Sequence, residues 1–393
     1  MTRVAIAVVA IGVFLGSWSL LHHGTLARGQ IEDTGLYEQY GDEIVHGSVP
    51  YRDFHLEYPP GALPVFILPS LGHEGDRAAY DRWFDRLMAL LGCVAIAGAA
   101  LALRALRAST ARTAVALGIV ALSPLLAGSV VLSRFDLWPA CLAVLALAAL
   151  LSERLSLGAV ALGAAIGAKL WPAVIAPVAI VWIWRTRGRS AALRWTALLV
   201  AVDAAIFVPF AVLSPGGLEA SFRAQLSRPL QLESLGGAVL IALHRVFGTK
   251  LHVFTTMSQN LSGTGAHAAE IATSVAQAVA LVVVWLLYAR GPATRERLVA
   301  YSVAAVAAFL AFSKVFSPQF VIWLVPLAPL VRRRLAVAAF VAALALTGIY
   351  FPRHYWRLTA LESPQSWELL VRDLLVVAVF ALLALAPGRE RVE

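Results

Sequence analysis

Long uncharged stretches alternate with short charged turns along most of this 393-residue chain. Two of the stretches, 87–103 and 113–132, carry no charged side chain. A run of about 18 or more apolar residues can span the hydrocarbon core of a bilayer. The pattern predicts one integral membrane domain over 1–393, an all-α, polytopic transmembrane helical bundle. The expected spans, about twelve in number, are 4–21, 87–103, 113–132, 137–151, 155–168, 170–184, 195–213, 271–289, 298–312, 319–331, 335–351 and 367–386.

The apolar segment 58–71 departs from this pattern. It contains a Pro pair followed by Gly61, Pro64 and Pro69, and prolines interrupt a straight helix. Counting it as a crossing would also place the arginine-rich turn 104–112 outside the cell, whereas such turns favour the cytoplasm. We therefore predict an interfacial or re-entrant element on the outer face, and a similar juxtamembrane element at 237–248.

Basic residues define the expected orientation. Short loops rich in Lys and Arg stay on the cytoplasmic side of a membrane, and every second connection between the expected spans is rich in arginine. We therefore predict a multi-pass cell-membrane protein with both termini in the cytoplasm. The other connections form outer segments, chiefly a first outer loop at 22–86 and a second large outer segment at 214–270. The first apolar run is followed by no convincing small-x-small cleavage site, which favours a retained helix over a signal peptide.

Composition narrows the function classes. The chain is 60% hydrophobic and 14% charged, with a net charge of +9. The basic excess lies in the arginine turns and forms no basic stripe with interleaved aromatics, so nucleic acid is not an expected partner. The sequence has no Walker loop, dinucleotide fingerprint or HExxH motif, so nothing supports nucleotide or zinc hydrolysis. Cys93 and Cys141 lie in apolar runs and are expected to pack in the core.

The first outer loop is the densest polar region of the chain. Glu32 and Asp33 follow the first span, where partial desolvation raises the pKa of a carboxylate toward neutral pH. Such an acid suits a general base. The alternative is that the acids of this loop only keep it solvated. The polar residues of the loop include Glu32, Asp33, Tyr37, Glu38, Asp42, Glu43, Arg52, Asp53, His55 and Glu57.

Four ionisable residues lie in or beside later spans. Asp136 either caps the next helix or has a functional role, and Arg134 can pair with it or meet a phosphate. Lys169 lies where two short spans meet, a depth at which an ionisable residue is costly and functional by default; snorkelling is the alternative. Asp203 lies in mid-span, and we expect it to form a structural ion pair inside the bundle.

Two further outer turns carry basic groups. The turn 313–319 offers the ammonium group of Lys314, two hydroxyls and the amide of Gln319, which suit a lipid-linked phosphate. Arg353 opens a basic and aromatic cluster at 353–357 on the same face. Interfacial anchoring alone is the alternative explanation of that cluster.

Five segments in order resemble one family. The stretch from Glu32 to Gly61 is similar to the first outer loop of bacterial GT-C-type, polyprenol-phosphate-sugar-dependent glycosyltransferases. It is most like a mannosyltransferase-like group formerly known as a domain of unknown function. The other matching segments are Arg134-x-Asp136-x-x-Pro139, Gly163 to Lys169-x-x-Pro172, Arg228-Pro229-x-Gln231-x-Glu233-Ser234 and Lys314-x-Phe316-Ser317-Pro318-Gln319-x-x-x-Trp323.

The resemblance implies a GT-C-like enzyme that moves a sugar, mannose-like, from a polyprenyl-phosphate donor to an acceptor hydroxyl with inversion. It implies Asp33 as the catalytic base, with Glu32 as the fallback. The expected partners are the polyprenyl-phosphate-linked sugar, a glycan or glycolipid acceptor and the lipid bilayer. No cofactor is expected, although paired acids holding a divalent cation stay open as an alternative. Supporting or acceptor roles fall to Asp53, Glu57, Asp136 and Tyr37, and donor-phosphate roles to Lys314, Arg134, Lys169, Arg353 and Gln319.

Two other functions are compatible with a many-helix bundle. A lipid or sugar transporter or flippase needs a polar path to both faces, whereas the cytoplasmic half here shows only arginine turns. A non-catalytic scaffold predicts no outer-face cavity beside Asp33.

Overall fold

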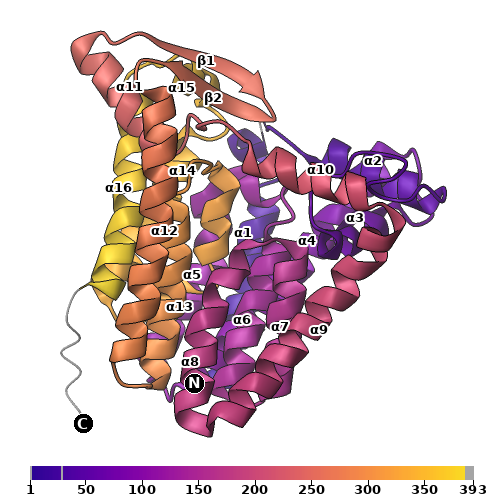
Figure 1. Ribbon diagram of the computed structural model, residues 1–393, viewed down its shortest axis with the longest axis vertical. Helices are drawn as coiled ribbons and strands as arrows, with labels where there is room; N and C mark the ends of the chain where they lie inside the picture. The colour runs from indigo at the N-terminus through magenta and orange to yellow at the C-terminus, as the bar shows by residue number, and fades with distance from the viewer. Residues whose placement is uncertain (1, 28–29, 386–393) are drawn as a thin grey trace.

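The computed structural model describes residues 2–27 and 30–385, and most of them are helical. The longer helices run side by side between two ends of the molecule (Figure 1). They are α1 (Arg3–Leu20), α4 (Arg77–Ala105), α5 (Thr110–Ala127), α6 (Leu137–Leu151), α7 (Leu155–Ala168), α8 (Ala176–Arg187), α9 (Arg189–Leu213), α12 (Ala266–Arg290), α13 (Arg295–Ala311), α14 (Arg334–Tyr350) and α16 (Gln365–Ala384).

Shorter elements cover the end of the bundle that lies opposite the N-terminus (Figure 1). The two strands form one antiparallel hairpin, in which Leu251 lies opposite Gly263. We call this end the covered end. Its elements are α2 (Thr34–Val45), α3 (Leu63–Ser70), α10 (Pro215–Leu226), α11 (Leu235–Phe247), β1 (Leu251–Thr256), β2 (Ser258–Gly263) and α15 (Tyr355–Thr359).

The predicted fold class is confirmed, because helical structure coincides with every predicted span. Two details differ. Helix α4 begins at Arg77 instead of residue 87, so it extends into the segment predicted as the first outer loop, 22–86. The predicted span 319–331 is not an α-helix but two 3-10 helices, η5 (Pro318–Leu324) and η6 (Ala328–Leu330). Proline lacks the amide hydrogen that an α-helix needs, and this segment contains several.

Helix α9 lies at the edge of the bundle (Figure 1). By length and composition it can cross a membrane, as can α1, α4, α5 and α12, but only 6% of its apolar window is buried, against 56% for the α5 segment. The predicted ion pair of Asp203 is therefore wrong. Asp203 lies in α9, and its carboxylate forms no ion pair with any residue that the structure describes. An edge helix offers too few neighbours to bring a cation to this position.

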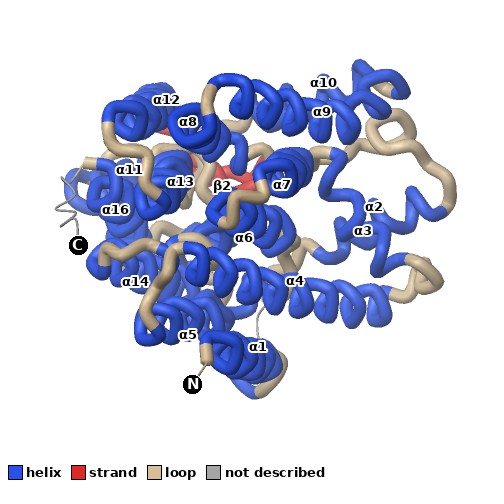
Figure 2. Tube along the Cα trace, turned by 90° about the horizontal axis from the view of Figure 1, so that it is seen from below, coloured by secondary structure: helices blue, strands red, loops and turns tan. Residues whose placement is uncertain are grey.

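The arginine-rich turns gather at the end of the bundle opposite the covered end; Figure 2 views the molecule from this side. Arg3 donates a 2.6 Å hydrogen bond to the carbonyl of Ala108. Arg112 pairs with Glu296 at 2.6 Å, across a large separation in sequence. These contacts join the start of α1 and the turns before α5 and α13 into one arginine-rich end. The compartment that this end faces stays a prediction.

A contact between two glycines positions the 58–71 segment, which forms the short helix η2 (Pro60–Ala62) and then α3. A Cβ atom on Gly61 would lie 2.4 Å from the carbonyl carbon of Gly167, so no side chain fits at this contact. Trp138 donates a 3.0 Å hydrogen bond to the carbonyl of Gly61. Because α7 ends just after Gly167, the contact brings the first outer segment close to Lys169.

Candidate active site

An ion pair joins Asp33, at the start of α2, to Arg134, in the turn before α6. Asp33 Oδ1 lies 2.9 Å from Arg134 Nη1, and the side chains are 32% and 5% exposed. Asp33 occupies the N-cap position of α2, but its carboxylate forms no capping hydrogen bond. The site therefore presents a partly open carboxylate held by a buried guanidinium.

A second ion pair lies beside the first. Lys169 Nζ is 2.6 Å from Asp136 Oδ1, and Asp136 is almost completely buried. The indole of Trp323 donates a hydrogen bond to the same carboxylate oxygen. The Lys169 ammonium also lies 4.7 Å from the centroid of the Phe135 ring and 5.1 Å from that of Phe320. Aromatic faces stabilise a desolvated cation, so Lys169 is held from several sides.

The geometry shows which partners Asp136, Arg134 and Lys169 have, while their functional roles stay predictions. Asp136 stands at the N-cap of α6 but makes no side-chain capping bond. Arg134 pairs with Asp33 rather than with Asp136, and Lys169 turns inward instead of snorkelling. The structure brings two carboxylates and two cations into one cluster, which we call the acid–base cluster.

Burial raises the pKa of Asp33 above the usual aspartate value. The Arg134 guanidinium opposes this rise most strongly, whereas the negative charge of Asp136 adds to it. The net rise moves Asp33 toward the range in which a carboxylate accepts a proton from a substrate. These electrostatics are compatible with a general base, and that role for Asp33 stays a prediction.

Aromatic rings form one wall of the acid–base cluster. Tyr37, from α2, stacks on Phe66 of α3 with ring centroids 4.6 Å apart. Tyr58 packs edge-on against Phe135, with ring centroids 4.9 Å apart, and Phe135 follows Arg134 in the chain. The predicted juxtamembrane element therefore lies against the site, and Tyr37 is part of its packing.

Arg77 anchors the other face of α2. It lies 3.6 Å from Glu32, 3.3 Å from Glu38 and 2.8 Å from Asp81. The Glu32 carboxylate is therefore paired with Arg77. A pocket of about 400 Å³ lies beside Glu32. Its walls come from residues that flank Asp33 and Arg134 in the sequence and from the first turns of α4. The lining residues are His22, Gln30, Glu32, Thr34, Asp81, Arg82, Asp85, Arg86, Leu132 and Ser133.

Two other predicted acids lie apart from the ion pairs. Asp53 is exposed and pairs with its neighbour Arg52 at 2.9 Å. Hydrogen bonds from Arg52 and from the Val49 amide lower the pKa of Asp53 to about 2, which leaves it a poor base. Burial raises the pKa of Glu57, and the charge of Arg228 opposes that rise. Burial therefore raises the pKa of Glu57 as it does that of Asp33.

The predicted phosphate ligands of the later turns are dispersed. Lys314 Nζ lies 2.9 Å from a carboxylate oxygen of Glu270 and 3.1 Å from the carbonyl of Leu226. Gln319 lies in η5, the 3-10 helix that also carries Trp323. Arg353 is exposed in the turn between α14 and α15.

A second polar cluster lies deep below the covered end. Three of its residues, Gln231, Glu233 and Ser317, lie in segments that resemble the family, but the sequence assigned them no role. Gln231 donates hydrogen bonds to Glu233 at 2.7 Å and to Ser317 at 2.9 Å. Arg372, fully buried in α16, donates to the carbonyl of Glu233 at 2.8 Å and pairs with Asp373. Burial raises the pKa of Glu233 to about 8, and the charge of Arg372 opposes this rise. The sequence did contain one signal for this cluster, because Arg372 and Asp373 are adjacent charged residues within an otherwise apolar span.

Arg228 is another residue that the sequence left without a role. It lies near Glu57, Tyr58 and Glu233, and its charge interacts with all three. Its Nε is buried without a partner among the described residues, and Nη1 makes only a 3.5 Å contact to Gln225. Within the described part of the chain, no three His, Cys, Asp or Glu side chains come together as a metal site.

A bundle of apolar helices with ion-paired acids and bases at one end defines a helical membrane protein with a site suited to acid–base chemistry. A family model for glycosyltransferase family 87 matches residues 54–318, more than half of the chain. The chain belongs to glycosyltransferase family 87 and is a membrane glycosyltransferase. The predicted resemblance is confirmed at this level. The match begins after Asp33, so it does not include that residue.

Solved structures of an archaeal oligosaccharyltransferase from Archaeoglobus fulgidus are also similar. The apo form is 14% identical with a TM-score of 0.49, over 97% of this chain and 55% of that one. The protein in complex with an inhibitory peptide and a dolichol-phosphate is 13% identical with a TM-score of 0.48, over 97% and 55%. This chain spans about half the length of these relatives, 55% in both cases. Among curated proteins, none matches this chain.

Proposed function

We propose that this glycosyltransferase takes a mannose-like sugar from a polyprenyl-phosphate donor and passes it, with inversion, to a hydroxyl of a glycan or glycolipid acceptor on the outer face of the cell membrane. One observation carries the proposal. The partly open carboxylate of Asp33 lies 2.9 Å from the buried guanidinium of Arg134. Sugar transfer from a lipid phosphate needs a base for the acceptor and a cation for the leaving group, and both are side by side here.

The proposed reaction is a single displacement. Asp33 accepts the proton of the acceptor hydroxyl while the hydroxyl oxygen forms a bond to the anomeric carbon. The bond between the anomeric carbon and the phosphate oxygen breaks, and that oxygen keeps the electron pair. Attack from the face opposite the phosphate inverts the anomeric centre. The lipid phosphate leaves as a dianion and needs no proton if a cation binds it.

Arg134 has two roles in this proposal, one before the donor binds and one after. Without substrate its guanidinium is shared with Asp33 and opposes the rise in the pKa of that carboxyl. When a donor phosphate approaches, the guanidinium binds it bidentately, as arginine binds phosphates generally. This removes the opposing charge from Asp33, and the pKa of the base rises further. Donor binding would thus activate the base.

The other cations have different surroundings. Lys169 and Asp136 neutralise each other at 2.6 Å and hold the turn that carries Arg134. Lys314 is paired with Glu270. Arg228 has no acidic partner within ion-pair distance among the described residues, and it lies near Glu57 and Tyr58. We therefore add Arg228 to Arg134 as a candidate ligand of the donor phosphate.

The decisive variant is Asp33→Asn, which keeps the size of the side chain and removes its basicity. We expect the purified variant to keep its melting temperature within a few degrees and to lose sugar transfer by about 10²-fold or more. The assay is transfer of labelled sugar from a polyprenyl-phosphate donor to membrane acceptors. Glu219→Gln is the matched control, since Glu219 is an exposed acid of α10 whose one ion pair among the described residues is with Arg223. Full activity of Asp33→Asn would remove this residue from the mechanism.

The same assay has an expected pH dependence. Only the carboxylate form of Asp33 accepts a proton, so activity should fall as the pH drops through its pKa. Because burial raises this pKa, the acid limb should lie at higher pH than for an exposed aspartate.

A further inference from the structure

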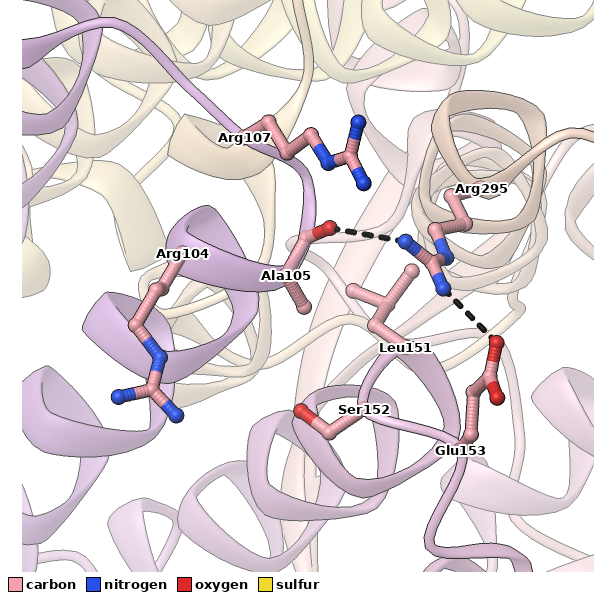
Figure 3. Close-up of a pocket in the computed structure, with 7 residues that line it drawn as sticks. All are labelled: Arg104, Ala105, Arg107, Leu151, Ser152, Glu153 and Arg295. Atoms are coloured by element: carbon pink, nitrogen blue, oxygen red, sulfur yellow. Dashed lines mark hydrogen bonds and ion pairs between the residues drawn. The ribbon is translucent and has the colours of Figure 1, made fainter.

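The arginine-rich end of the bundle contains a pocket that the proposed chemistry does not use. Its volume is about 430 Å³. Three turns that are far apart in sequence supply its walls: the turn after α4, the turn after α6 and the start of α13 (Figure 3). Arginine is the main polar residue of the lining, with Arg104, Arg107 and Arg295.

Only one of these three arginines is neutralised. Arg295 donates to Glu153 at 2.9 Å and to the carbonyl of Ala105 at 3.4 Å (Figure 3). The other oxygen of Glu153 is occupied by Arg187. Glu153 is the only acid of the lining, so its charge is already used.

Arg104 and Arg107 are both exposed, and neither makes a side-chain hydrogen bond or ion pair with any described residue. In Figure 3 the guanidinium of Arg107 points across the pocket toward Arg295. The guanidinium of Arg104 lies on the other side of Ala105 from those of Arg107 and Arg295 (Figure 3), and the lining as a whole has a positive excess. An arginine that serves only to retain a loop in the cytoplasm needs no such pocket.

The geometry points to a binding site for a phosphate group at this end of the protein, separate from the acid–base cluster. The guanidinium fork matches the oxygens of a phosphate, and several forks together bind it more strongly than one. Basic pockets between membrane helices on the cytoplasmic side are suited to phosphorylated lipid headgroups. A soluble phosphate compound presents the same chemistry, so the two sources require separate tests.

The test uses the full chain in a neutral detergent and measures its melting temperature. One arm adds inorganic phosphate, and the other adds a short-chain phosphatidic acid, with a short-chain phosphatidylcholine as the neutral lipid. The variant is Arg104→Gln with Arg107→Gln. The matched control is Arg189→Gln with Arg194→Gln, which removes the same charge from exposed residues near the same end and outside the pocket. Within the described part of the chain neither altered pair loses a hydrogen-bond or ion-pair partner, so both variants should fold.

We expect a ligand-dependent rise in melting temperature for wild type and the control, and an apparent affinity at least about tenfold weaker for the pocket variant. A response to inorganic phosphate identifies a soluble phosphate as sufficient. A response only to phosphatidic acid identifies a lipid headgroup. If the control variant loses as much apparent affinity as the pocket variant, the ligand is bound by general surface charge, and the proposed site is overturned. No response of wild type to either compound also overturns it.

Discussion

At the scale of single residues, Lys169 shows how the site is stabilised. The residue lies next to a transmembrane helix, where an unpaired ammonium is costly. Its charge is compensated by Asp136 at 2.6 Å, and Asp136 is only 1% exposed. Removing one partner of such a pair leaves an uncompensated buried charge, which costs about 3–5 kcal/mol.

We therefore expect Lys169→Met to lower the stability of the protein by about this amount, about 3–5 kcal/mol. The measurement is thermal unfolding of the purified protein in detergent. Adding Asp136→Asn to the same variant should restore most of the loss, because the amide carries no charge and still accepts a hydrogen bond from Trp323. Wild-type stability of the single variant would show that the pair contributes nothing.

At the scale of elements, the short helices of the covered end place the aromatic wall. The 58–71 segment was predicted to be interfacial or re-entrant, and the structure shows it as the short helices η2 and α3, with α3 packed against α2 and α4. Its position relative to the membrane stays a prediction. The 3-10 helices η5 and η6 were not predicted, although the sequence of the segment 319–331 contains prolines. The contact of Gly61 with Gly167 was not visible either, because it joins residues far apart in the chain.

Gly61→Ala tests this contact. The new Cβ would lie 2.4 Å from a backbone carbon of Gly167, so the 58–71 segment must move. Overpacking of this kind typically costs about 1–3 kcal/mol. We expect lower thermal stability and reduced sugar transfer, because Tyr58 and Phe66 shift with the segment.

Gly118→Ala in α5 is the control for that variant. A Cβ there meets nothing within 4 Å, so activity should be unchanged. Equal loss of activity in both variants would mean that the Gly61 contact has no special role.

At the scale of the whole molecule, the bundle separates two ends of different chemistry. One end gathers arginine turns, and the other carries the acid–base cluster, the hairpin and the short helices. Positive turns favour the cytoplasm, so the covered end is expected to face outward. Substrates on a lipid carrier would then reach Asp33 from the outer leaflet.

Cysteine labelling in intact cells tests this orientation. Thr255→Cys lies on the hairpin and Ser190→Cys at the start of α9, and both positions are exposed. A membrane-impermeant thiol reagent should label the first variant in intact cells and the second only after permeabilisation. Labelling in the reverse pattern would place the proposed active site in the cytoplasm.

The sequence by itself determined the helical membrane class, the approximate positions of the long helices and the family, because long apolar runs and the family's motifs are local signals. It also singled out Asp33, Arg134, Asp136 and Lys169 as candidates. Only the tertiary structure decided how they pair: Asp33 with Arg134 and Asp136 with Lys169. It also left Asp203 without a cation. Pairing depends on which helices pack together, and that information is spread over the whole chain and does not lie in any one segment.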